Sequence, residues 1–234
     1  MTPRNHAEHT GRPDGGPAAT TERVVRAGLI AILRAPTARR FLAVTEVLVD
    51  AGIRAVEITL TAPDAVEAIA KVTAEFGSVA TVGAGTVLSA DQAEACIDSG
   101  AEFLVSPTAA PDMVAAAQIA GVAAYPAGLT PTEIVAAHRA GATAVKLFPA
   151  SAVGPRFITD LHGPFPAIPV IPTGGIAVED IPQWLAAGAA AVGVGGPLLG
   201  NAARDGRDAG GLRTRAGRAV ELVAQARAEA GTAR

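Results

Sequence analysis

The stretch "AGIRAVEITL", residues 51–60, contains a small residue, a glycine and then an apolar run interrupted by one carboxylate, Glu57. A continuous apolar run rich in Val and Ile is typical of a strand that is covered on both faces. A glycine directly before such a run indicates a helix that ends in a left-handed residue and turns into the strand. The stretch therefore predicts a helix–strand junction of an α/β protein.

This junction recurs along the whole chain. The glycines that lead the successive runs are Gly28, Gly52, Gly77, Gly100, Gly121, Gly141 and Gly188. Their spacings are 24, 25, 23, 21, 20 and 47 residues, so the last gap is about twice the others. An eighth run, "IPVIPTGG" at residues 168–175, falls inside that gap. Stretches between the runs, such as residues 64–77, carry apolar residues at helical spacing.

Eight apolar strands, each followed by a helix, predict a parallel sheet that closes into a single (β/α)8 TIM barrel over residues 21–234. An open doubly wound sheet is the structural alternative, but near-equal repeat units favour closure. Residues 1–20 are polar and rich in Pro and Gly, and we expect them to form a disordered tail. Near the other end, we expect a loop over residues 201–211 and the last helix over residues 212–231.

Composition excludes several classes of function. With a net charge of −3 and 3% aromatic residues, the chain has neither a basic stripe nor a stacking surface for nucleic acid. It has no apolar run long enough to cross a bilayer and no secretion signal, so we expect a cytoplasmic protein without a membrane partner. The single cysteine, Cys96, excludes an intramolecular disulfide and is expected in the core. The four histidines show no metal-ligand spacing, and no metal site is predicted.

In a parallel barrel, chemistry takes place at the carboxyl ends of the strands and in the loops that follow them. The residues at these positions are Arg34, Glu57, Thr59, Thr61, Thr86, Ser106, Pro107, Thr108, Tyr125, Lys146, Thr173, Gly174, Gly175, Gly195 and Gly196. A small-molecule site is therefore expected among them.

Lys146 is the first candidate, because the chain has 17 arginines and only two lysines. It lies in the apolar run "AGATAVKLFP", on the same strand face as Ala144 and Phe148. One interpretation is a lysine whose stem lines the barrel while its ammonium reaches solvent. The other is a buried amine, which is costly to keep charged and, once neutral, attacks ketones to form a Schiff base. The residues alone do not decide between the two.

Glu57 and Arg34 also have two interpretations each. Glu57 is either a structural partner of an arginine such as Arg34 or a general acid/base that works with Lys146. Burial raises the pKa of a carboxyl group and nearby cations oppose that change. Arg34, at the end of the first strand, either neutralises Glu57 or binds a substrate carboxylate or phosphate bidentately. We favour a substrate role for Arg34.

Two glycine pairs follow the last two strands of the barrel. Gly174 and Gly175 stand in "IPTGGIAVED", and Gly195 and Gly196 stand in "GVGGPLLG". Such glycines are often only turn residues, but the loops after strands seven and eight are where barrels bind phosphate, through backbone N–H groups and a helix N-terminus. A third turn, "GAGTVL", offers the hydroxyl of Thr86 to a substrate carboxylate. It lacks the spacing of a dinucleotide site.

The motifs "VEITL", "GAGTVL", "SP", "KLFPA" and "PTGG" follow one another in this order, on the ends of five strands. With them the chain resembles the 2-keto-3-deoxy-6-phosphogluconate / 4-hydroxy-2-oxoglutarate aldolases, a family of metal-independent class I aldolases. The resemblance runs from about Leu29 to Leu199. "ILR" on the first strand and "FPASAVGP" after the lysine are most similar to the branch that acts on 2-keto-3-deoxy-6-phosphogalactonate.

The resemblance implies a mechanism. Lys146 would form a Schiff base with C2 of a 2-oxo acid, and Glu57, through a water, would move the protons. Cleavage would give pyruvate and D-glyceraldehyde 3-phosphate. No metal or other cofactor is implied, because the protonated imine is the electron sink.

The resemblance also implies further roles and an assembly. Thr86 would contact the pyruvate carboxylate, Pro107 would shape the pyruvate pocket, and Phe148 would lie beside the lysine. The glycines that would bind phosphate are Gly174, Gly175, Gly195 and Gly196. The family further implies a homotrimer.

Two positions depart from the family pattern. Thr61 stands where gluconate-type members often carry an arginine, so Arg34 is expected to bind the carboxylate instead. Pro197 stands where many members have a serine that helps to hold phosphate, and proline supplies neither a hydroxyl nor an N–H. The alternative function is therefore a 4-hydroxy-2-oxoglutarate aldolase, which gives pyruvate and glyoxylate, or a broad 4-hydroxy-2-oxo acid aldolase without a strict phosphate requirement.

Two rivals belong to other classes of protein. A transferase similar to thiamine phosphate synthase would need acidic residues for magnesium and a basic pyrophosphate site, and the strand ends carry neither cluster. A non-catalytic barrel that binds a phosphorylated ligand would need neither Lys146 nor Glu57.

Overall fold

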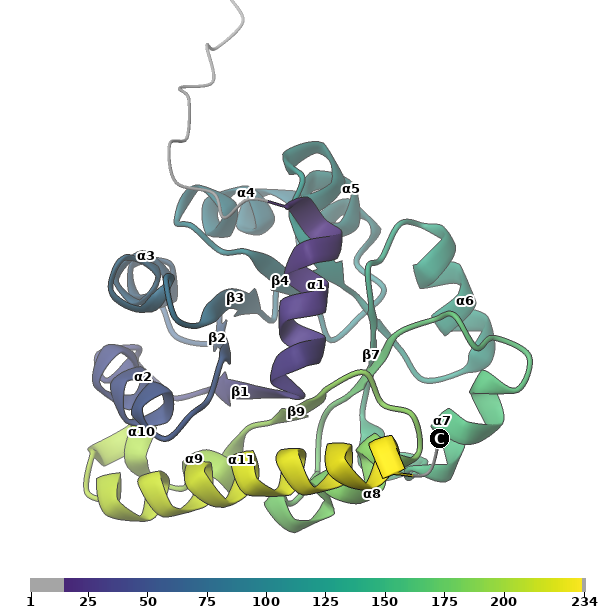
Figure 1. The fold of residues 1–234 in the computed structure, drawn as a ribbon. Helices are drawn as coiled ribbons and strands as arrows, with labels where there is room; N and C mark the ends of the chain where they lie inside the picture. Colours follow the sequence, from purple (N-terminus) through teal and green to yellow (C-terminus); the bar gives the residue numbers. More distant parts are fainter. Residues whose placement is uncertain (1–14, 233–234) are drawn as a thin grey trace, which may run out of the picture.

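The computed structural model describes residues 15–232 (Figure 1). The strands are β1 Leu29–Leu33, β2 Ala55–Thr59, β3 Thr81–Gly85, β4 Phe103–Val105, β5 Ala123–Tyr125, β6 Ala127–Gly128, β7 Val145–Leu147, β8 Val170–Pro172 and β9 Val192–Val194. The α-helices are α1 Gly16–Ala27, α2 Phe41–Asp50, α3 Ala65–Phe76, α4 Ala90–Asp98, α5 Pro111–Ala120, α6 Pro131–Arg139, α7 Arg156–His162, α8 Ile181–Ala186, α9 Gly196–Leu199, α10 Ala202–Asp205 and α11 Ala209–Thr232. Two 3-10 turns are η1 Ala150–Ala152 and η2 Val178–Asp180.

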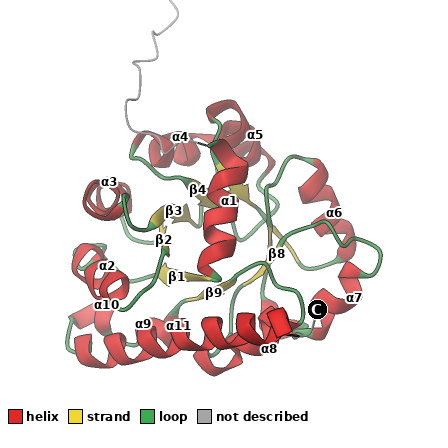
Figure 2. Cartoon of the chain, viewed as in Figure 1, coloured by secondary structure: helices red, strands yellow, loops and turns green. Residues whose placement is uncertain are grey.

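The strands form two parallel sheets, with the helices around them (Figure 2). One sheet is curled and has the order β5-β4-β3-β2-β1-β9, and the other has the order β6-β7-β8. The predicted α/β class, with parallel strands alternating with helices, is confirmed. The expected single sheet is interrupted at Pro126, which lacks an N–H for the ladder and splits the fifth predicted strand into β5 and β6. Between β8 and β9 the pairing is limited to one parallel bridge, Thr173 with Gly193.

Alternation along the strands creates two apolar layers. The outer layer packs the strands against the helices, as Val56 and Ile58 of β2 do. The inner layer fills the space that the strands enclose, and its buried residues are Val24, Ile30, Ile32, Ala55, Phe103, Val105, Ala123, Tyr125, Ala144, Ile171 and Ala191. The inner faces of strands from both sheets therefore share one core.

Helix α1 lies across the amino ends of the strands, in purple in the middle of Figure 1. Its Thr21 hydroxyl lies 3.2 Å from the Tyr125 hydroxyl, and the Tyr125 ring stacks on Phe103 with 5.3 Å between ring centroids. Arg23 forms an ion pair with the carboxylate of Glu102, just before β4. These contacts close the end of the enclosed core opposite to the expected site.

The chain ends differ from the sequence prediction in two places. Residues 16–20, expected in the tail, are the first part of α1, where Thr20 and Thr21 are buried. Residues 1–14 lie outside the described residues, and the prediction of a tail is untested there. Residues 201–211, expected as a loop, contain the short α10 and the start of α11.

Six of the seven leading glycines have the expected positive φ at a helix end. Gly77 does not: its φ is −60° and its ψ is −20°, because the chain continues through a further turn before β3. Cys96 is fully buried, as predicted, and burial raises the pKa of its thiol to about 12. No helix within residues 15–232 is both long enough and apolar enough to cross a membrane.

Candidate active site

Glu57 on β2 and Lys146 on β7 are both buried, with 2% and 5% of their surface exposed. Glu57 stands two residues after Ala55, and Lys146 stands two residues after Ala144. Both alanines belong to the inner layer. Since side chains alternate along a strand, both charged groups point into the enclosed core. This burial favours the buried-amine interpretation of Lys146 over the one in which its ammonium reaches solvent.

The polar ends of the Glu57 and Lys146 side chains are not satisfied by protein groups within residues 15–232. Neither the Glu57 carboxylate nor the Lys146 Nζ has a hydrogen-bond partner within the part of the chain that is described. Yet no completely enclosed side-chain nitrogen or oxygen of that part lacks a partner. The oxygens of Glu57 and Lys146 Nζ must therefore keep some accessible surface, as groups that await a small substrate would.

The Lys146 Nζ lies 5.0 Å from the centroid of the Phe148 ring. An ammonium over an aromatic face is attracted by the negative face of the ring. Phe148 is half-buried, and its ring also approaches Gly174, where an added Cβ would be 3.0 Å from a ring carbon. The Phe148 ring therefore lies next to both the Lys146 amine and the turn at Gly174.

Burial raises the pKa of the Glu57 carboxyl above its usual range, and the positive charges of Lys146 and Arg34 oppose this change. The expected direction and both expected cations are confirmed. A carboxyl group with a raised pKa can exchange protons near neutral pH, which is what a general acid/base must do. Lys146 opposes this change although it lies on a strand of the other sheet.

Arg34 is exposed and donates from Nη2 to the Thr86 hydroxyl at 3.4 Å. Within residues 15–232, no ion pair joins Arg34 to Glu57, which leaves the guanidinium edge open to a ligand. Thr86 has a φ of +63°, an unusual conformation for a β-branched residue. Strained backbone of this kind is concentrated at binding sites, so it marks the Thr86 turn as part of the site.

Gly85 lies directly before Thr86. Because it has no side chain, the Glu57 carboxylate can occupy the space beside it. A Cβ built on Gly85 would lie 1.8 Å from Glu57 Oε1, so no other residue fits without moving the carboxylate. Gly85 and Glu57 lie on the paired strands β3 and β2. The position of the acid therefore depends on the glycine of its neighbour strand.

The two glycine pairs follow β8 and β9. They lie at the edge of the core formed by the carboxyl ends of the strands, which we call the rim. Gly174 and Gly175 have φ values of +96° and +73°. The amides of Gly175 and Gly195 donate to no acceptor within residues 15–232, and Gly196, as first residue of α9, has no helical acceptor. The Gly174 amide faces the Gly193 carbonyl across the bridge between β8 and β9. Backbone N–H groups that protein leaves free at a rim can bind the oxygens of an anion.

The other candidates at the strand ends have local partners. The Thr59 hydroxyl donates to the Leu33 carbonyl at 2.9 Å and lies 2.9 Å from the Thr61 hydroxyl. Pro107 is half-buried between Ser106 and Thr108, whose hydroxyls lie 3.2 Å apart. Thr173 is buried beside Gly193 of the neighbouring strand. These residues lie at the carboxyl ends of the strands.

Tyr125 is the last residue of its strand, as expected, but its side chain does not point to the site. Its hydroxyl reaches Thr21 of α1 at the amino end of the core. A large aromatic side chain extends several ångströms from its Cα, and here it points away from the rim. Residue spacing predicts the face of a strand that a side chain occupies but not its direction along the strand.

Ser151 was missed by sequence reasoning. It lies in η1, five residues after Lys146, and its backbone N–H donates to the Gly174 carbonyl at 3.1 Å. Its hydroxyl lies against Gly175, where an added Cβ would be only 2.7 Å away. The position of the serine within "FPASAVGP", next to the lysine motif, was the signal that could have found it.

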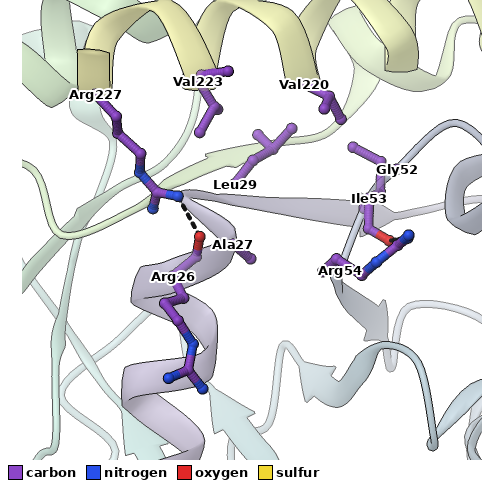
Figure 3. A pocket seen from close by; sticks show the side chains of 10 residues that line it. Arg26, Ala27, Leu29, Gly52, Ile53, Arg54, Val220, Val223 and Arg227 are labelled. Atoms are coloured by element: carbon purple, nitrogen blue, oxygen red, sulfur yellow. Dashed lines mark hydrogen bonds between the residues drawn. The ribbon is translucent and has the colours of Figure 1, made fainter. Parts of the chain in front are cut away.

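A cavity of about 220 Å³ lies elsewhere, between the inner face of α11, the end of α1 and the starts of β1 and β2 (Figure 3). None of the predicted site residues lines it. Arg227 donates to the carbonyls of Arg26 and Val25 at the end of α1, and the Arg26 side chain points away along α1. The other residues that line the cavity are apolar or glycine, apart from Arg54. The cavity contains no carboxyl group or lysine amine to compare with those at the strand ends.

Residues 20–209 match the family model described as "KDPG and KHG aldolase", that is, aldolases of 2-keto-3-deoxy-6-phosphogluconate and 4-hydroxy-2-oxoglutarate. The chain belongs to this aldolase family. The resemblance seen in the sequence is thereby confirmed, and the protein is an enzyme of the carbon–carbon lyase class.

Individual relatives agree with this assignment. The 2-dehydro-3-deoxy-6-phosphogalactonate aldolase of Escherichia coli K12 is 37% identical over 84% of this chain and 89% of its own length. A solved native KDPGal structure is 36% identical over 85% of this chain and 95% of its own, with a TM-score of 0.79. A designed protein cage made by fusing symmetric oligomeric domains is 33% identical over 88% of this aldolase and 75% of its own chain, with a TM-score of 0.81. The thiamine phosphate synthase-like and non-catalytic rivals are therefore set aside.

Proposed function

We propose that this aldolase cleaves a 2-keto-3-deoxy-6-phospho sugar acid to pyruvate and D-glyceraldehyde 3-phosphate through a Schiff base on Lys146. The observation that carries the proposal is the burial of Lys146 and Glu57, which both point into one enclosed core. A low-polarity site with one amine and one carboxyl group that accepts and returns protons suits imine chemistry.

The steps follow from these two groups. The Lys146 amine attacks the C2 carbonyl, water leaves, and the protonated imine forms. Glu57, through a water, takes the proton of the C4 hydroxyl while the electrons of the C3–C4 bond move into the imine. The aldehyde departs, C3 of the enamine takes back a proton that Glu57 supplies, and water hydrolyses the imine to release pyruvate. The imine accepts the electrons, so this route needs no metal or other cofactor.

Arg34 and Thr86 are the proposed partners of the substrate carboxylate, and the rim glycines are the proposed phosphate site. The free amides of Gly175 and Gly195 support the phosphate assignment. The similarity to a phosphogalactonate aldolase over 84% of the chain favours the galactonate-type substrate. Pro107 and Phe148 would complete the wall of the pyruvate pocket.

We further propose that the two sheets act as one closed eight-stranded barrel in a cytoplasmic homotrimer. The bridge between Thr173 and Gly193, and the single residue between β5 and β6, support closure. The likeness to a cage built from symmetric oligomeric domains supports an oligomer. Sedimentation analysis of the purified chain tests the trimer directly.

The Schiff base is tested by trapping. The protein is incubated with pyruvate, reduced with borohydride and digested, and each lysine peptide is weighed. We expect the adduct on Lys146 alone. Lys71 is an internal control, because it is exposed and ion-paired with Glu67 on the surface of α3. An unmodified Lys146, together with activity that survives Lys146→Ala, would exclude the proposed mechanism.

The alternative function is a 4-hydroxy-2-oxo acid aldolase without a strict phosphate requirement, and Pro197 is the observation that favours it. Turnover of phosphorylated and non-phosphorylated substrates, 4-hydroxy-2-oxoglutarate included, separates the two. We expect a higher kcat/KM for the phosphorylated sugar acid. Equal values would mean that the glycine turns are only structural.

A further inference from the structure

Pro197 removes two donors from the rim at which phosphate is proposed to bind. It is exposed and directly follows Gly196, at the second position of α9. Proline has no N–H, and it has no hydroxyl to replace that donor. A phosphate group carries charge on several oxygens, and each oxygen that finds no donor weakens its binding. This side of the rim therefore offers backbone amides alone.

The neighbouring side of the rim has a serine. The loop after β7 and the loop after β8 are joined by two backbone hydrogen bonds, from Ala150 to the Thr173 carbonyl at 2.9 Å and from Ser151 to the Gly174 carbonyl at 3.1 Å. These bonds hold the serine in a fixed place beside the glycine turn. A Cβ added to Gly175 would lie 2.6 Å from the Cβ of Ser151 and 2.7 Å from its Oγ. Only a glycine at this position lets the hydroxyl and the turn come so close.

The Ser151 hydroxyl is free to act as a donor. Ser151 is exposed, and its Oγ forms no hydrogen bond with any residue in the described range 15–232. The Gly175 amide beside it is also free. The hydroxyl and this amide, on two neighbouring loops, give two donors for a tetrahedral anion.

We propose that Ser151 is a specificity residue that donates its hydroxyl to the substrate phosphate and so takes over the contact that Pro197 cannot make. The inference rests on the proposed function and assigns this part of phosphate recognition to the loop after the lysine strand. Ser151 takes no part in the bond cleavage, and its contribution is confined to phosphorylated substrates.

The test is Ser151→Ala, assayed with a phosphorylated sugar acid and with the same acid without phosphate. We expect KM for the phosphorylated substrate to rise roughly tenfold to hundredfold, the effect of losing one hydrogen bond to a charged group. We expect kcat/KM for the non-phosphorylated substrate to stay the same. Ser78→Ala is the matched control, because Ser78 is also exposed but lies in the turn before β3. It should change neither value.

A second substitution tests the exchange between the two sides of the rim. Pro197→Ser in the Ser151→Ala background should restore most of the lost affinity for the phosphorylated substrate. An unchanged KM in Ser151→Ala, or an equal rise for both substrates, would overturn the inference.

The trapping experiment keeps this outcome separate from the proposed function. Wild-type protein and Ser151→Ala should both form the pyruvate adduct on Lys146. Adducts in both proteins with an unchanged KM would reject the role of Ser151 alone. If wild-type protein forms no adduct, the proposed function fails first.

Discussion

At the scale of single residues, the stability of the folded protein depends on the charge of Glu57. Its pKa is raised because burial disfavours the carboxylate more than Lys146 and Arg34 stabilise it. Folding therefore opposes ionisation of this group, and the protein is less stable above that pKa than it would be with a neutral side chain. The group proposed as general acid/base is thus held at the expense of stability.

Glu57→Gln should lower the turnover and raise the stability of the protein. We expect turnover to fall roughly 10²–10⁴-fold, because the proton transfers lose their acid and base, while the pyruvate adduct on Lys146 still forms. We also expect a higher free energy of unfolding than wild type at neutral pH. This gain should vanish as the pH falls below 4.5, where Glu57 is protonated in the folded and the unfolded chain. Steady-state assays and urea unfolding across pH measure the two. Near-normal turnover would remove Glu57 from its proposed role.

Gly85→Ala should act on the same carboxylate from the neighbouring strand. The new Cβ would lie 1.8 Å from Glu57 Oε1, so the acid must move. We expect turnover to fall roughly 10²-fold with imine formation preserved. Gly217→Ala is the control, because nothing lies within 4 Å of its added Cβ in α11. That control should keep full activity and gain about 0.5–1 kcal/mol of stability. Normal turnover in Gly85→Ala would show that the site tolerates a displaced acid.

At the scale of elements, most helices begin without a side-chain cap, and α6 is an exception. The Thr130 side chain accepts the Glu133 N–H, and the Glu133 carboxylate accepts the N–H groups of Leu129 and Thr130, both at 2.9 Å. These bonds lower the pKa of Glu133. The cap therefore contributes stability at neutral pH that is lost as the pH falls through this lowered pKa.

Thr130→Ala should lower the free energy of unfolding by about 1 kcal/mol, because the start of α6 loses one partner of its capping box. Activity per folded molecule should not change, since Thr130 lies outside the candidate site. Urea unfolding at neutral pH measures the loss. A stability equal to wild type would show that water replaces the cap.

At the scale of the whole molecule, α1 and its contacts close the amino end of the core. Arg23 of α1 also reaches Thr20 at 3.1 Å and Thr81 of β3 at 3.4 Å, and so it connects the helix with the sheet. Burial raises the pKa of Glu102, although Arg23 and the Val82 amide oppose this. The pair thus holds a buried carboxylate that would be unfavourable by itself.

Arg23→Met should lower the free energy of unfolding by about 2 kcal/mol at neutral pH, because Glu102 loses its cation. Without the arginine the pKa of Glu102 rises further, so the loss should be larger at alkaline pH and smaller in acid, where Glu102 is protonated. Unfolding curves at the two extremes of the stable pH range give the difference. A loss that does not depend on pH would mean that packing, not charge, is what Arg23 supplies. Pyruvate trapping on Lys146 should persist, since α1 lies at the opposite end of the core.

The sequence by itself determined the order and type of the strands and suggested the proposed reactive pair. Seven leading glycines, and one apolar run inside the double gap, located the eight predicted strand runs. The rule that chemistry follows parallel strands placed Lys146 and Glu57 among the candidates. The prediction from glycine spacing and apolar pattern failed at Gly77 and at residues 16–20, because a short turn and a helix with few apolar residues carry little periodic signal. The order and type of the strands depend on local pattern, and local pattern can be read from a single sequence.

Only the tertiary structure decided which groups lie next to one another. Alternation along a strand specifies the face that a side chain occupies, but the partner across the core depends on how the sheets curl, and no periodicity encodes that. The coupling of Glu57 with Lys146, the turn of Tyr125 toward α1 and the contact of Ser151 with Gly175 all join segments that are distant in sequence. Such contacts arise from the packing of the complete fold, so they become visible only once the strands have been placed in space.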